Sequence, residues 1–114
     1  TIVEKNGELF MTLGTPGGST IITSVVQTIL NVHEFNMTMQ EAVNSARFHH
    51  QWKPDSIRIE SELFDDQVRN NLIKSGYRLN DKGPIGRVDG ILVKKDKKLE
   101  GGADKRGDDT AIGF

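Results

Sequence analysis

One short stretch combines residues that could stabilise a negative charge: residues 13–20, LGTPGGST, named here the glycine turn. A strand-like run, residues 8–13, leads into it, and an apolar helix-like run leaves it at Ile21. A strand, a turn and a helix in this order aim several backbone N–H groups at one small volume, beside the positive end of the helix. Gly17 and Gly18 have no Cβ, so the backbone there is uncovered. The pattern predicts half of an anion or oxyanion site.

The spacing within the glycine turn leaves three interpretations open. It could be an oxyanion hole, a phosphate cradle, or only a tight connection between a strand and a helix. It lacks the Gly-Lys-Ser/Thr ending of a phosphate loop and the Gly-x-Gly-x-x-Gly spacing of dinucleotide-binding folds.

A second candidate is the pair His49 and His50, with Arg47 and Trp52 nearby. The two histidines could be metal ligands or a general base. However, adjacent side chains in an extended segment point to opposite faces, and His33 is not spaced to help them. Packing or hydrogen bonding is therefore the favoured interpretation.

An acidic stretch near the C-terminus is a third candidate, with Asp104, Asp108 and Asp109 around Arg106. It could bind a cation, but its spacing does not match a calcium loop, which needs a glycine at position six and a late glutamate. The pattern favours a solvated or salt-bridged turn in which Arg106 ties down the C-terminus.

Thr1 is a fourth candidate, because an N-terminal threonine can act as a nucleophile with its own amine as base. Here it begins an apolar Thr-Ile-Val run without a polar neighbour in the sequence. We interpret Thr1 as a cleavage boundary and not as a nucleophile.

The elements that must position these residues follow from apolar spacing and turn signals. Asn6-Gly7 predicts a hairpin between strands at 2–3 and 9–13. Residues 20–33 carry two apolar rows at i, i+4 spacing and predict a well-buried helix, with Ser19 or Thr20 as its cap. A helix at 39–46 follows a Thr38–Glu41 capping box, and a loop at 47–54 and a strand at 56–60 come after it. The next predicted helix runs from Asp65 or Asp66 to just before Gly76, with Val68, Leu72 and Ile73 inward. The last predicted elements are a strand at 77–79, a loop at 80–86, and a hairpin of strands 88–94 and 99–103 closed over Asp96 and Lys97.

The length predicts one domain over residues 1–114. The predicted helices and strands make this domain α/β. The net charge of −1 gives no electrostatic argument for binding nucleic acid or an anionic membrane. The chain has no cysteine, which excludes disulfides, thiolate catalysis and cysteine-ligated zinc.

Three motifs follow one another along the chain and cover most of it. They are Pro-Gly-Gly-Ser at 16–19 with Ile-Ile-Thr at 21–23, Ala-Arg-Phe-His-His-Gln-Trp at 46–52 with Pro-Asp at 54–55, and Gly-Ala-Asp-x-Arg at 102–106 with Asp-Asp at 108–109 and a final Ala-x-Gly-aromatic. In this order they resemble the signatures of the γ-glutamyltranspeptidase family.

This resemblance implies the N-terminal-nucleophile hydrolase fold, an αββα sandwich, in a proenzyme that cleaves itself into a large and a small subunit. The chain resembles the C-terminal part of the small subunit. The implied activity is transfer or hydrolysis of the γ-glutamyl group of glutathione and related amides through an acyl-threonine, without metal or other cofactor. Gly17 and Gly18 match the family residues whose N–H groups bind the oxyanion. The family also suggests a periplasmic or extracellular location.

The family's nucleophile lies upstream in a Thr-Thr-His-like context that this sequence lacks, and Thr1 does not match it. The glutamate-binding residues are also outside the chain, so the 114 residues alone are expected to release no aniline from a γ-glutamyl anilide. The implied partners are the large subunit, the rest of the small subunit and a small γ-glutamyl substrate, with no nucleic acid or membrane contact.

Two alternatives remain open: a related acylase of the cephalosporin acylase type, and a non-catalytic module that binds a small anion. A piece of a layered sheet should also expose strand edges and apolar faces. We therefore expect self-association or partial disorder of the isolated chain, above all in the C-terminal tail and the loop at 80–86.

Overall fold

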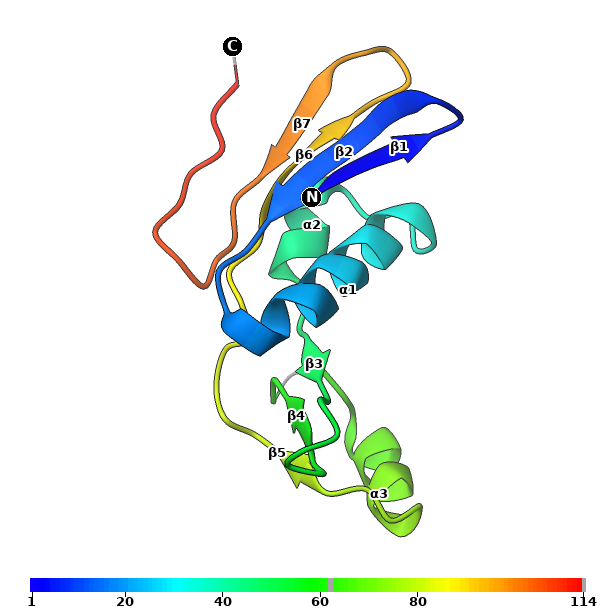
Figure 1. The fold of residues 1–114 in the computed structure, drawn as a ribbon, viewed down its shortest axis with the longest axis vertical. Coiled ribbons are helices and arrows are strands. Elements are labelled where there is room, and N and C mark those ends of the chain that lie inside the picture. The colour runs from blue at the N-terminus through cyan, green and yellow to red at the C-terminus, as the bar shows by residue number, and fades with distance from the viewer. Residues whose placement is uncertain (62, 114) are drawn as a thin grey trace. The chain divides into compact units, whose positions relative to one another are not determined.

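The chain folds into two compact units, residues 1–45 with 86–114 (the first unit) and residues 46–85 (the second unit). The computed structural model describes residues 1–61 and 63–113, so Phe114, the aromatic end of the third motif, lies outside the described residues. Each unit holds its own sheet and at least one helix, which confirms the predicted α/β class (Figure 1). The single domain over residues 1–114 stays a prediction.

A four-stranded antiparallel sheet organises the first unit. Asn6 and Gly7 both have positive φ, 55° and 79°, and form the predicted hairpin turn. The predicted hairpin over Asp96 and Lys97 is also confirmed. In sheet order the strands are β1 (Ile2–Lys5), β2 (Glu8–Gly14), β6 (Asp89–Val93) and β7 (Leu99–Gly102).

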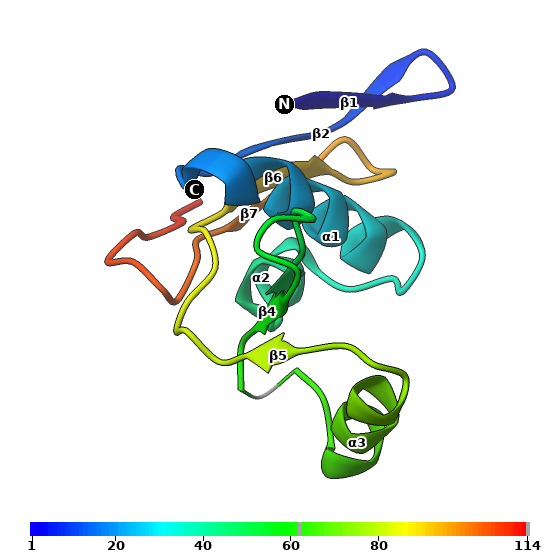
Figure 2. The ribbon, with the colours of Figure 1, turned by 60° about the horizontal axis from the view of Figure 1, so that its bottom comes forward.

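Two helices, α1 (Ile21–His33) and α2 (Met39–Asn44), cover one face of this sheet (Figures 1 and 2). The predicted capping box of α2 is confirmed, because Thr38 Oγ1 accepts from the Glu41 N–H and the Glu41 carboxylate accepts from the Thr38 N–H. The core between helices and sheet consists of Met11, Leu13, Val25, Val32, Met39, Ala42, Val43 and Val88.

The prediction that α1 is well buried is wrong for one of its two apolar rows. Ile22, Val26 and Leu30, which form this row, are 74%, 48% and 42% exposed. The helix is packed on a sheet from one side only, so a second row has no partner within the first unit. The buried positions of α1 are Ser24, Val25, Thr28 and Val32. No helix of the described residues is long and apolar enough to cross a bilayer.

The second unit contains a three-stranded sheet. Phe48 pairs with Ile59, so a short strand stands inside the segment 47–54 that was predicted to be a loop. Cross-strand pairing, which a local pattern does not reveal, is the reason. The order is β3 (Phe48–His49), β4 (Ile57–Ile59) and β5 (Leu79–Asn80), with β4 antiparallel to β3 and parallel to β5.

The helix of the second unit, α3 (Asp66–Lys74), begins and ends as the sequence predicts. Asp65 caps it by accepting from the Val68 N–H at 2.8 Å, and Gly76 follows it with a φ of 91°. The predicted inward face is wrong for Val68 and Ile73, which are exposed, whereas Leu72 is half-buried; α3 has no fully buried residue.

Candidate functional site

The glycine turn connects the end of β2 to the start of α1 and stands at the surface. Residues 16–19 are exposed, whereas Thr20 is buried. A short 3-10 helix, η1 (Gly18–Thr20), precedes α1 directly. The predicted side-chain cap is wrong: no side chain caps α1, because Thr20 is already helical and its hydroxyl points back to the Gly17 carbonyl.

The N–H groups of Gly17 and Gly18 donate no hydrogen bond within the part of the chain that the structure describes. Gly17 has a φ of 141° and Gly18 a φ of 58°, conformations that favour glycine. A Cβ built on Gly18 would meet no atom within 4 Å, so the space beside this residue is open. The turn thus presents two unused donors next to the positive end of a helix.

The two peptide groups that carry these N–H donors also carry the carbonyls of Pro16 and Gly17, and both carbonyls accept hydrogen bonds from threonines. Thr15 Oγ1 donates to the Pro16 carbonyl at 2.7 Å. The Gly17 carbonyl accepts from the Thr20 N–H at 3.2 Å and from Thr20 Oγ1 at 3.0 Å. Two threonine hydroxyls therefore flank the glycine pair.

A distant segment supports the turn. The Arg87 N–H donates to Thr15 Oγ1 at 2.8 Å, although 72 residues separate the two. Gly86 lies so close that a Cβ there would come within 3.0 Å of Thr15 Oγ1 and 2.7 Å of Ser24 Oγ. The sequence places Gly86 at the end of a predicted loop, and no local pattern connects it, or Arg87, with the glycine turn.

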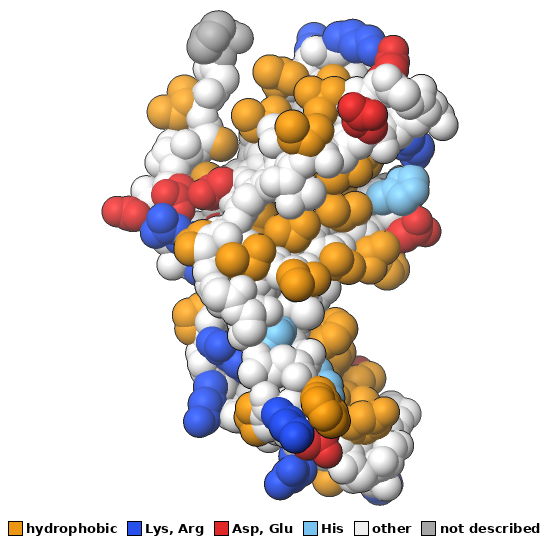
Figure 3. Space-filling model, viewed as in Figure 1, with side chains coloured by type: hydrophobic (Ala, Val, Ile, Leu, Met, Phe, Trp, Pro, Cys, Tyr) orange, Lys and Arg blue, Asp and Glu red, His pale blue; other side chains and the backbone are white. Residues whose placement is uncertain are grey.

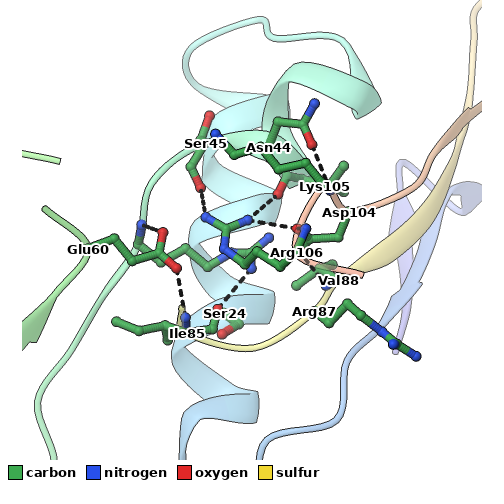
Figure 4. Close-up of polar contacts among 12 residues, drawn as sticks. Ser24, Asn44, Ser45, Glu60, Ile85, Arg87, Val88, Asp104, Lys105 and Arg106 are labelled. Carbon is green, nitrogen blue, oxygen red and sulfur yellow. Dashed lines mark hydrogen bonds and ion pairs between the residues drawn. The ribbon is translucent and has the colours of Figure 1, made fainter. Parts of the chain in front are cut away.

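The C-terminal turn is held by a buried ion pair (Figure 4). Arg106 Nη1 is 2.8 Å from Asp104 Oδ1, and the two side chains are 7% and 0% exposed. The Arg106 guanidinium also donates to the carbonyls of Val43 and Ser45 at the end of α2. The prediction of a salt-bridged turn with Arg106 as its tie is confirmed.

In the second unit, the histidines make local hydrogen bonds. His49 Nε2 is 2.9 Å from Gln51 Oε1, and His50 Nε2 is 3.2 Å from Asp55 Oδ1. Arg47 is buried and donates to the Ile85 carbonyl at 2.9 Å. Among the described residues, no three His, Asp or Glu side chains gather as metal ligands would.

Thr1 pairs with β2 as an ordinary strand residue does. Its nitrogen donates to the Leu13 carbonyl at 2.8 Å, and its carbonyl accepts from the Leu13 N–H at 3.0 Å. Neither contact is the polar partner that a nucleophilic threonine needs.

The whole chain, residues 1–114, matches the family model described as gamma-glutamyltranspeptidase. The chain belongs to the γ-glutamyltranspeptidase family. The glutathione hydrolase proenzyme of Escherichia coli K12 is 38% identical over an alignment of 115 positions, which covers 100% of this chain but only 20% of that protein. A second such proenzyme, from Pseudomonas sp. A14, is 41% identical over 82% of this chain and 16% of that protein. The chain thus spans about a fifth of the length of these two proenzymes.

Solved γ-glutamyltranspeptidases share its fold. An acivicin-inhibited enzyme superimposes with a TM-score of 0.89 at 45% identity, over 95% of this chain and 59% of that chain. The Helicobacter pylori enzyme gives 0.88 at 44% identity, over 94% and 59%. A cephalosporin acylase from Bacillus halodurans, with a TM-score of 0.80 at 21% identity over 91% of this chain and 20% of that chain, shows the fold alone. These neighbours confirm the predicted hydrolase fold.

Proposed function

We propose that this chain is part of a γ-glutamyltranspeptidase and that Gly17 and Gly18 supply its oxyanion hole. The parent enzyme takes the γ-glutamyl group from glutathione or a related amide and passes it to water or an amino acid. The glutathione hydrolase relatives support this activity. The observation that carries the site is the pair of exposed N–H groups without an acceptor in the described chain.

The chemistry needs such donors. When a threonine hydroxyl attacks an amide, negative charge develops on the carbonyl oxygen, and donors that are already in place stabilise it. A Cβ built on Gly18 would meet no atom within 4 Å, so the surface beside this residue is open to a substrate. The nucleophile belongs to a part of the parent enzyme outside this chain, so the chain alone is proposed to be inactive.

The proposed partner of the chain is the rest of the parent enzyme, the large subunit and the remainder of the small one. The exposed row of α1, Ile22, Val26 and Leu30, is a surface suited to it. Figure 3 shows hydrophobic side chains gathered over α1 and the neighbouring strands.

The test is Gly18→Ala in the full-length parent enzyme, assayed on a γ-glutamyl anilide. Gly18 has a φ of 58°, which an L side chain adopts only with strain, so alanine should shift the turn and misdirect its N–H groups. We expect kcat to fall by about 10²-fold, as when a donor is lost. Gly7→Ala is the matched control, because Gly7 also has positive φ and open surroundings but lies at the far hairpin.

An unchanged kcat in the Gly18 variant, with Gly7→Ala also active, would refute the oxyanion assignment. Retained binding of phosphate by a parent protein that turns over no amide would instead support a small-anion module. Turnover of a cephalosporin side chain in preference to the γ-glutamyl anilide would support the acylase alternative, for which the structural likeness shows only the fold.

A further inference from the structure

The two proposed donors share their peptide groups with two carbonyls that threonine hydroxyls bind. The Gly17 N–H belongs to the same peptide as the Pro16 carbonyl, and the Gly18 N–H to the same peptide as the Gly17 carbonyl. A trans peptide is planar, and its N–H and C=O point in opposite directions. Fixing the carbonyl therefore fixes the direction of the donor.

We infer that Thr15 and Thr20 are positioning residues that aim the two oxyanion donors, an inference that rests on the proposed function. Thr15 Oγ1 binds the Pro16 carbonyl at 2.7 Å and so orients the Gly17 N–H. Thr20 Oγ1 binds the Gly17 carbonyl at 3.0 Å and so orients the Gly18 N–H. Neither hydroxyl contacts the reacting atoms; each acts through a peptide group.

The surroundings hold both hydroxyls in place. Thr20 is 6% exposed, and its Oγ1 lies 2.5 Å from the position that a Cβ on Gly17 would occupy. Thr15 Oγ1 accepts the Arg87 N–H at 2.8 Å, so its own proton is directed to the Pro16 carbonyl. A hydroxyl that donates to the carbonyl of a peptide also polarises that peptide and strengthens its N–H as a donor.

A hydroxyl that only stabilised the fold would affect folding without a specific effect on turnover. The chain offers matched controls for this distinction. Thr28 is fully buried and donates to the Ser24 carbonyl at 2.9 Å within α1, as Thr20 donates to a backbone carbonyl. Thr12 Oγ1 on β2 donates to the Thr1 carbonyl at 3.2 Å and is the control for Thr15.

The experiment compares Thr15→Val and Thr20→Val with Thr12→Val and Thr28→Val in the full-length parent enzyme. Valine keeps the shape of threonine and removes the hydroxyl. We expect kcat on a γ-glutamyl anilide to fall about tenfold to a hundredfold for the first two, less than the loss of a whole donor, with KM within about twofold. The controls should keep kcat. Thr15→Val also leaves the Arg87 N–H without its acceptor, so its unfolding midpoint should lie below that of Thr12→Val. The unfolding midpoint of every variant is therefore measured, and kcat is compared at a temperature at which all of them are folded.

Serine variants provide the second readout, because Thr15→Ser and Thr20→Ser keep the hydroxyl and should restore most of kcat. The inference is overturned if the valine variants keep kcat, if the controls lose as much, or if serine does not restore it. Gly18→Ala distinguishes failure of the positioning role from failure of the oxyanion site. If Gly18→Ala loses kcat while Thr15→Val and Thr20→Val keep it, only the positioning role is refuted. If Gly18→Ala keeps kcat, the oxyanion site itself is refuted.

Discussion

The ion pair between Asp104 and Arg106 is the clearest case of one side chain holding distant backbone in this chain. Arg106 binds the Asp104 carboxylate and two carbonyls at the end of α2, while Asp104 Oδ2 accepts the Val88 N–H at 2.8 Å. The C-terminal turn, α2 and the start of β6 are thereby linked. Removing one partner of a buried pair leaves the other charge uncompensated.

Arg106→Ala is therefore expected to destabilise the fold by about 3–5 kcal/mol. The measurement is urea unfolding of the parent enzyme, followed for the segment that contains this chain. Lys98→Ala is the control, because Lys98 Nζ pairs with Asp96 Oδ2 at 3.3 Å from a side chain that is 80% exposed. Such a surface pair contributes about 0–1 kcal/mol, and equal losses for both variants would contradict the prediction.

Between elements, Glu100 joins the start of α2 to β7. Its carboxylate accepts the N–H of Met39, the first residue of α2, at 2.7 Å, and Lys94 Nζ lies 3.1 Å away. The Met39 N–H lowers the pKa of Glu100 below its usual value of 4.5. Because the folded state lowers this pKa, the contribution to stability is complete above about pH 4.5 and is lost as the pH falls through the folded value.

Glu100→Gln tests this contact, because glutamine can still accept the N–H but does not titrate. At pH 6 the opening free energy of α2, from amide hydrogen exchange in the parent enzyme, should fall by about 0.3–1 kcal/mol. As the pH falls from 5 through the folded pKa of Glu100, the opening free energy of α2 in the unmodified protein should fall to that of the glutamine variant. Glu8→Gln, at an exposed pair with Lys97, should leave α2 unchanged. If the difference in opening free energy between the two proteins grew toward acid pH, folding would raise the pKa of Glu100 and the prediction would be wrong.

For the whole molecule, the exposed apolar row of α1 decides how the chain behaves alone. Ile22, Val26 and Leu30 are exposed in this chain. Contiguous apolar surface of this kind favours association.

The isolated chain is expected to self-associate, with a light-scattering mass above its 12.7 kDa. Replacing the row with Val26→Gln and Leu30→Gln should reduce the mass, because it removes the apolar contact. Val68→Gln, at an exposed position of α3, should not. A monomer at all concentrations would count against the prediction.

Much of the local structure was predictable because its determinants lie within a few residues of each other. The Asn6-Gly7 turn, the Thr38–Glu41 capping box and the Asp65 cap depend on short side-chain to backbone contacts, and all are present. The apolar rows predicted α1 itself but not which row is buried, because that depends on which neighbour the helix meets.

By itself, the sequence determined the family, the α/β class, the order of most elements and the glycine turn as the candidate site. Only the tertiary structure decided what surrounds that turn: Arg87 contacts Thr15 from 72 residues away, and Gly86 lies beside the same hydroxyl. It also decided that Arg106 binds the end of α2. The physical reason is range, since turns and caps are set by neighbouring residues, whereas the direction of a peptide N–H is set by whatever distant segment packs against its carbonyl.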